Sequence, residues 1–144
     1  KLKELELQSA GEKMNLFTKT IAEKTELIEQ LQLQLEEHAA NPLLQQNLET
    51  LKQKTILTEE DWNGFQQLFE KIYPNFFERL RRKNSDITHA ELRFAAIIRL
   101  QMNNRQAGAM LGISADSARK TRQRLRQRLN LPEEANLEQF ILTL

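Results

Sequence analysis

The side chains of this sequence that could do chemistry on a partner are the arginines, lysines and glutamines gathered towards its C-terminus. Residues 81–130 hold twelve Lys/Arg against three Asp/Glu, whereas residues 1–50 hold five against nine. Guanidinium and ammonium groups bind phosphates and donate to O6 and N7 of guanine, and the glutamine amide pairs with N6 and N7 of adenine. Such a basic block favours a polyanionic partner, although charge alone fits a solvated basic surface equally well.

A helix over 115–129 would sort these side chains into two faces, because successive residues turn by about 100°. The arc that we expect to face the protein interior carries Ala118, Arg122, Leu125 and Leu129. The opposite arc carries Asp116, Arg119, Lys120, Gln123, Arg124 and Gln127. Residues near the N-terminal end of a recognition helix usually contact base edges, so we expect Arg119, Lys120 and Gln123 to read bases.

Other polar side chains of this region are expected to hold DNA phosphates: Arg105, Ser114, Ser117, Arg124 and Arg126. Arg122 is different, because it falls on the inward arc, where an unpaired charge is costly. We therefore expect Glu91, from the preceding predicted helix, to pair with Arg122.

The residues before this helix predict a helix-turn-helix over 103–131. Gly108 leaves room where a short helix near 104–111 crosses the next one, and Gly112 suits a turn that needs positive φ. Ser114 is a suitable N-cap for the basic helix, where a phosphate could also bind. An ordinary amphipathic helix with a solvated basic face explains the arginines but not this order of Gly108, Gly112 and Ser114.

Residues 1–52 are predicted to form coiled-coil and linker helices, with a break at 39–42 caused by Pro42. Apolar residues from position 7 to 38 follow a heptad, which indicates a dimer seam for dimerisation and signal transmission. The expected seam residues are Leu7, Met14, Phe17, Ile21, Ile28, Leu31 and Leu35. The alternative is one amphipathic helix packed against its own domain, since polar residues interrupt the heptad.

Residues 57–144 are predicted to form a compact helical bundle, so that the whole fold is all-α. An aromatic prefix helix over 58–83 starts at the N-cap Thr58 and is broken or kinked at Pro74. Its aromatic residues have helical spacing and acidic neighbours, which favours a core over a platform for stacking bases. Thr88 and Glu91 form a capping box for the next helix, and a short helix over 136–144 ends the chain.

Composition excludes several classes of protein. There is no cysteine, which rules out disulfides and thiolate sites, and the two histidines, His38 and His89, lack the partners of a catalytic or metal site. The segment around His38 has only a faint similarity to a histidine-kinase phosphoacceptor box. We expect no enzyme activity, no cofactor and no membrane contact within this sequence. Because the sequence begins inside a periodic pattern, we also expect it to be a cytoplasmic part of a longer protein.

The stretch from Thr88 and Glu91 through Asn104 and the Gly-Ile-Ser turn to Leu131 resembles the LuxR/GerE-type effector domain. That domain is a four-helix DNA-binding unit found at the end of bacterial sensor proteins, often after a β-propeller or tetratricopeptide-repeat sensor and a coiled coil. The segment from Thr58 to Leu80 is similar to the prefix found there. Ala107, Gly108 and Ala118 are smaller than the usual family residues.

The resemblance implies a transcription regulator that binds double-stranded DNA in the major groove as a homodimer, with Asn104 among its DNA contacts and RNA polymerase as a further candidate partner. The cytoplasmic location would hold whether or not the sensor is anchored in a membrane. Two alternatives stay open: a domain like region 4 of a sigma factor, and a coiled-coil signalling scaffold that binds no DNA.

Overall fold

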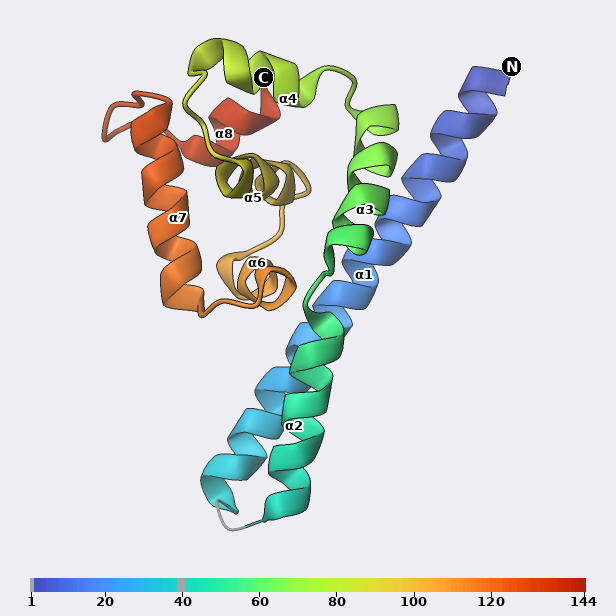
Figure 1. Ribbon diagram of the computed structural model, residues 1–144, viewed down its shortest axis with the longest axis vertical. Helices are drawn as coiled ribbons and strands as arrows, with labels where there is room; N and C mark the ends of the chain where they lie inside the picture. The colour runs from blue at the N-terminus through green and yellow to red at the C-terminus, as the bar shows by residue number, and fades with distance from the viewer. Residues whose placement is uncertain (1, 39–40) are drawn as a thin grey trace.

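The computed structural model describes residues 2–38 and 41–144, and within these ranges it contains helices and turns but no strand. The fold is therefore all-α, as predicted. Helices α1 (Leu2–Glu37) and α2 (Pro42–Thr55) form an antiparallel hairpin that extends from a head (Figure 1). The head contains α3 (Glu59–Ile72), α4 (Phe76–Lys83), α5 (His89–Arg99), α6 (Asn104–Leu111), α7 (Ala115–Arg128) and α8 (Leu137–Leu142). Across the described ranges, no helix is long and apolar enough to cross a membrane.

The hairpin starts its second helix at Asn41 and Pro42. The side-chain oxygen of Asn41 accepts hydrogen bonds from the N–H groups of Leu43 (3.0 Å) and Leu44 (3.4 Å). Pro42 occupies the first turn of α2, where no N–H donor is needed. The predicted break in the helix is confirmed at these residues, while its other two members, Ala39 and Ala40, lie outside the described residues.

The apolar face of α1 is buried within its own chain. Met14, Ile21 and Ile28 are only 3%, 3% and 8% exposed, and α1 packs against α2, α3 and α6. The ring of Phe17 lies 5.4 Å from that of Phe65 on α3. These four residues therefore pack within their own chain, as in the alternative of one amphipathic helix on its own domain, and the dimer seam stays a prediction. The physical reason is that α2, α3 and α6 supply the apolar surface that the heptad was expected to find on a second chain.

The remaining residues of the predicted seam are less buried. Leu7 is 50% exposed, and Leu31 and Leu35 are half-buried. Formation of a homodimer stays a prediction. In the arrangement described here, it would have to use surface other than that around Met14 and Ile21.

The aromatic prefix predicted over 58–83 forms two helices, α3 and α4, with the predicted break at Pro74. Pro74 separates them, and Asn75 adopts a left-handed conformation with φ of 65°, which asparagine tolerates better than most residues. The predicted N-cap of α3 is confirmed. Thr58 N–H donates to Oδ2 of Asp61 at 2.9 Å, and Asp61 N–H donates to Oγ1 of Thr58 at 3.0 Å.

The aromatic residues of α3 and α4 form a core, as predicted. Phe69 is fully buried, and its ring lies 5.7 Å from that of Phe65, 5.2 Å from that of Phe76 and 5.4 Å from that of Phe77. Trp62 is 4% exposed. Aromatic side chains bury more apolar area than other residues and stabilise a small domain accordingly. Because these rings contact one another, they are not available to stack on bases.

Helix α5 lies at the centre of the head and provides the platform for the C-terminal helices (Figure 1). Phe94, Ala95 and Ile97 are at most 1% exposed, and both α7 and α8 pack against α5. The capping box predicted at its start is confirmed: Thr88 N–H donates to Glu91 Oε1 at 2.9 Å, and Glu91 N–H donates to Thr88 Oγ1 at 3.2 Å.

Candidate nucleic-acid interface

The two helices of the predicted helix-turn-helix are present as α6 and α7, and side chains cap the start of each. Ser114 Oγ accepts a hydrogen bond from Ser117 N–H at 3.0 Å, which confirms Ser114 as the N-cap of α7. Asn103 and Gln106 form a capping box at the start of α6. Asn103 N–H donates to Gln106 Oε1 at 2.9 Å, and Gln106 N–H donates to Asn103 Oδ1 at 2.8 Å. Sequence reasoning missed this second box, although the Asn-x-x-Gln spacing is a signal that could have found it.

The geometry of the motif requires both glycines. A Cβ on Gly108 would lie 2.7 Å from the carbonyl oxygen of Ile113, closer than side-chain carbons approach backbone oxygens. The turn can therefore pack against α6 only because residue 108 has no side chain. Gly112 ends α6 with φ of 71°, in the left-handed region that favours glycine. Both glycines were predicted from the sequence for these reasons.

Helix α7 presents one face to the core and another to solvent, as its sequence predicted. Ala118 and Leu125 are fully buried, so they fix the rotation of the helix on α5 and α6. The side chains of Arg119 and Lys120 are 69% and 66% exposed. The exposed face of α7, which we call the α7 outer face, consists of Asp116, Arg119, Lys120, Gln123, Arg124 and Gln127.

Asp116 organises the N-terminal end of the α7 outer face. Its carboxylate lies 2.6 Å from Arg119 Nη2 and 3.5 Å from Lys120 Nζ. The hydrogen bond from Arg119, with the positive charges of both residues, lowers the pKa of Asp116 below its usual range. At neutral pH both basic groups therefore lie beside an ionised carboxylate.

Arg122 is paired, but not with the residue that we expected. It forms an ion pair with Glu138 of α8, whereas Glu91 lies 3.2 Å from Arg128 Nε at the end of α7. The prediction of a Glu91–Arg122 pair was wrong because α8 folds back over α5 and brings Glu138 to Arg122. Burial raises the pKa of Glu138. The hydrogen bond from Arg122, a backbone hydrogen bond and the positive charges of Arg122 and Arg126 together outweigh burial, so the pKa of Glu138 lies below its usual range.

The guanidinium of Arg126 is held by backbone carbonyl groups of its own chain. Its guanidinium donates to the carbonyl oxygens of Ala135 at 2.7 Å, Pro132 at 2.8 Å and Glu133 at 3.3 Å. These bonds fold the segment between α7 and α8 against the end of α7. Three of the five N–H donors of Arg126 are therefore used within its own chain, which indicates a structural role, while its expected contact with a DNA phosphate stays a prediction.

The other expected phosphate contacts lie near the turn of the motif. Arg105 is exposed, but Nη1 lies 2.5 Å from Oε1 of Glu29 on α1. Asn104 and Ser117 are half-buried, and Ser114 is exposed. Ser114 and Ser117 also share a hydrogen bond of 3.0 Å between their hydroxyl groups. These residues lie at the end of the head where α6 meets the start of α7.

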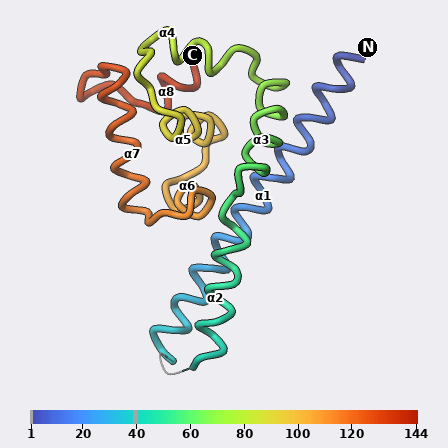
Figure 2. The backbone as a smooth tube through the Cα atoms, viewed as in Figure 1, coloured from blue at the N-terminus to red at the C-terminus, as the bar shows by residue number. Residues whose placement is uncertain are grey.

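The placement of α7 leaves its outer face uncovered by the hairpin. Helices α5 and α6 lie between α7 and the pair formed by α1 and α3, so that α7 forms the opposite edge of the head (Figure 2). The start of α7 points towards the same end of the molecule as α6. A long cylindrical ligand could therefore lie along this edge and contact the turn as well.

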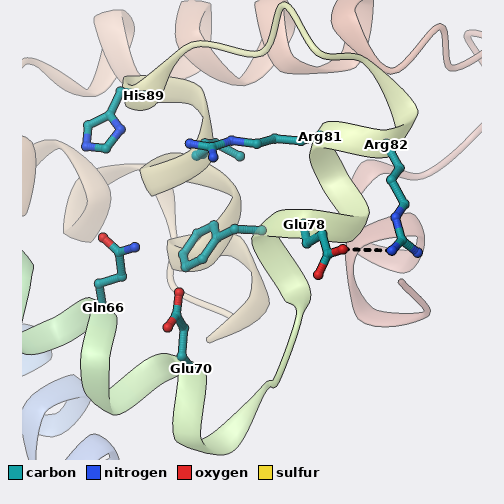
Figure 3. Close-up of a pocket in the computed structure, with 8 residues that line it drawn as sticks. Gln66, Glu70, Glu78, Arg81, Arg82 and His89 are labelled. Atoms are coloured by element: carbon teal, nitrogen blue, oxygen red, sulfur yellow. Dashed lines mark hydrogen bonds and ion pairs between the residues drawn. The ribbon is translucent and has the colours of Figure 1, made fainter.

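A separate hollow of about 460 Å³ lies between α3, α4 and α5 (Figure 3). Its polar lining residues are Gln66, Glu70, Glu78, Arg81, Arg82 and His89. Arg81 extends across the hollow towards His89, and Glu78 pairs with Arg82 at 2.7 Å. Among the described residues that line it there is no serine, threonine or cysteine, and the hollow contains none of the residues expected to contact DNA.

No family model matches the chain, and no curated protein and no solved structure matches it significantly.

Proposed function

We propose that this chain binds duplex DNA through its helix-turn-helix, with the α7 outer face in the major groove, as the output part of a transcription regulator. The observation that carries the proposal is the α7 outer face itself. Exposed Arg119, Lys120 and Gln123 follow one another along a helix whose opposite face is held by buried Ala118 and Leu125. These three types of side chain can donate to or pair with base edges.

Further features support duplex DNA over other polyanions. The α7 outer face combines two glutamines, Gln123 and Gln127, with its basic residues, and an amide on such a face is suited to adenine rather than to phosphate alone. A straight helix at the edge of a head fits the width of a major groove. The resemblance to the LuxR/GerE-type effector domain agrees with this function and extends it to the cytoplasmic output of a larger sensor.

The test is selection of bound sequences from random duplex oligonucleotides, followed by affinity measurements on the selected site over a series of salt concentrations. We expect affinity to fall steeply with salt, by about 0.9 in log–log slope for each phosphate contacted. Replacing Arg119 and Lys120 together by alanine should weaken binding to the selected site by at least about tenfold.

The matched control replaces two exposed lysines of α1, Lys13 and Lys19, by alanine. This removes the same charge from the far side of the molecule and should change the affinity little. If the wild-type protein selects no sequence and its binding shows no salt dependence, the proposal fails and a signalling scaffold becomes the better explanation.

A further inference from the structure

An open groove of about 510 Å³ lies where the hairpin meets the helix-turn-helix. Residues from α1, α2, α6 and the start of α7 line it, and its ionisable side chains are Glu29, Lys52 and Arg105. We call it the hairpin groove. It reaches Ser114 and Ala115 at the N-terminal end of α7, so it lies next to the end of the helix that the proposed function directs at DNA.

A negatively charged side chain of the protein itself already lies in the hairpin groove. The Glu29 carboxylate lies 2.5 Å from Arg105 Nη1, and both residues are partly solvent-exposed, with side chains 37% and 63% accessible. A carboxylate and a phosphate oxygen make the same kind of charge-assisted hydrogen bond to a guanidinium group. Glu29 therefore marks a position where a phosphate oxygen of DNA would also be bound.

Lys52 contributes a second positive charge from α2. Its side chain lines the groove and is half-buried. It forms no ion pair with any residue that the structure describes. A lysine held beside a groove without an acidic partner is available to a phosphate, which it binds as a point charge.

We infer that the hairpin groove is a phosphate-binding surface in which Lys52 and Arg105 hold the DNA backbone and Glu29 occupies Arg105 until DNA displaces it. The inference rests on the proposed function of α7. It extends the DNA-binding surface beyond the helix-turn-helix onto the hairpin. It also makes α1 an internal competitor of DNA, which agrees with the acidic excess in residues 1–50 beside the basic excess in residues 81–130.

The experiment measures binding of a fluorescently labelled duplex by anisotropy over a salt series. Glu29→Gln should bind about two- to fivefold more tightly than the wild type at low salt, which is the range expected for removing an exposed ion pair. Lys52→Ala should bind more weakly, and its log–log slope against salt should be smaller by about 0.9, the loss of one phosphate contact.

Matched controls separate local contacts from the general effect of charge. Glu26→Gln removes an exposed carboxylate one turn earlier on α1, and Lys54→Ala removes an exposed lysine of α2 that lies outside the hairpin groove. Glu29→Gln made in an Arg105→Ala protein should give no gain, because the residue that it releases is absent. Thermal unfolding of each variant checks that the fold is kept.

The outcomes also separate this inference from the proposed function. If the wild type binds duplex DNA but Glu29→Gln equals Glu26→Gln and Lys52→Ala equals Lys54→Ala, the inference is overturned and the function of α7 stands. A gain from Glu29→Gln that persists without Arg105 overturns it too. If no variant binds duplex DNA at any salt concentration, both proposals fall.

Discussion

Helices α1 and α7 are both amphipathic, and the sequence of each predicted a face directed at a partner. In α1 that face was apolar, and the structure buries it: Met14 and Ile21 are each 3% exposed. In α7 the face was charged, and it is exposed, with the Arg119 side chain 69% accessible. The difference follows from solvation. An apolar stripe is stabilised by any apolar surface within reach, including that of its own chain, whereas a charged face stays in water unless a partner neutralises it.

The largest expected effect tests which chain covers the apolar face of α1. Ile21→Ala should lower the free energy of unfolding by about 2–5 kcal/mol, the usual cost of truncating a buried aliphatic residue. Leu16→Ala is the control, since Leu16 lies on the same helix but is 65% exposed, and it should change stability by less than about 0.5 kcal/mol. Denaturant unfolding monitored by circular dichroism measures both.

The same proteins show whether the contact is made within one chain. If it is, any dependence of the melting temperature on protein concentration should be the same in the wild type and in Ile21→Ala. A melting temperature that rises with concentration, and does so less in Ile21→Ala, would contradict the packing of α1 on its own head and restore a dimer seam.

A smaller effect separates two neighbouring arginines of α7. Arg126→Gln should lower the free energy of unfolding by about 1–2 kcal/mol, because three backbone carbonyl groups lose a charged donor. Arg124→Gln should leave stability unchanged, since Arg124 is exposed, but should weaken duplex binding. Equal thermal stability of the two variants would show that Arg126 does not hold the segment after α7, and would return it to the expected DNA contacts.

The smallest effect is the pH dependence contributed by Glu138. Its pKa is lowered in the folded protein, so its pair with Arg122 stabilises the fold above about pH 4.5 and is lost as pH falls through the folded pKa. Since the Glu138 side chain is 38% exposed, the contribution is at most about 1 kcal/mol. Melting temperatures of wild type and Glu138→Gln at several pH values measure it: the difference should shrink below pH 4.5. A difference that is constant with pH would contradict the pairing.

Much of the fold could be predicted because the signals are local. The caps at Thr58, Thr88 and Ser114 depend on residues three positions away. The break at Pro74 depends only on the pyrrolidine ring of that residue. The rotation of α7 depends on the spacing of apolar residues along a single helix. For the same reason, helical spacing alone was enough to identify the exposed residues of the candidate interface, from Arg119 to Gln127.

Local sequence patterns were sufficient to predict that this chain is helical, where most of its helices begin and end, and which face of α7 is charged. The groups that these faces meet depend on how the helices pack in three dimensions. Glu29 pairs with Arg105 across 76 positions and Glu91 with Arg128 across 37. Helical periodicity fixes the direction of a side chain relative to its own helix, but a distant partner depends on how whole helices pack. That packing buries Met14 and Ile21 within the chain and gives Arg122 and Arg126 partners in their own chain.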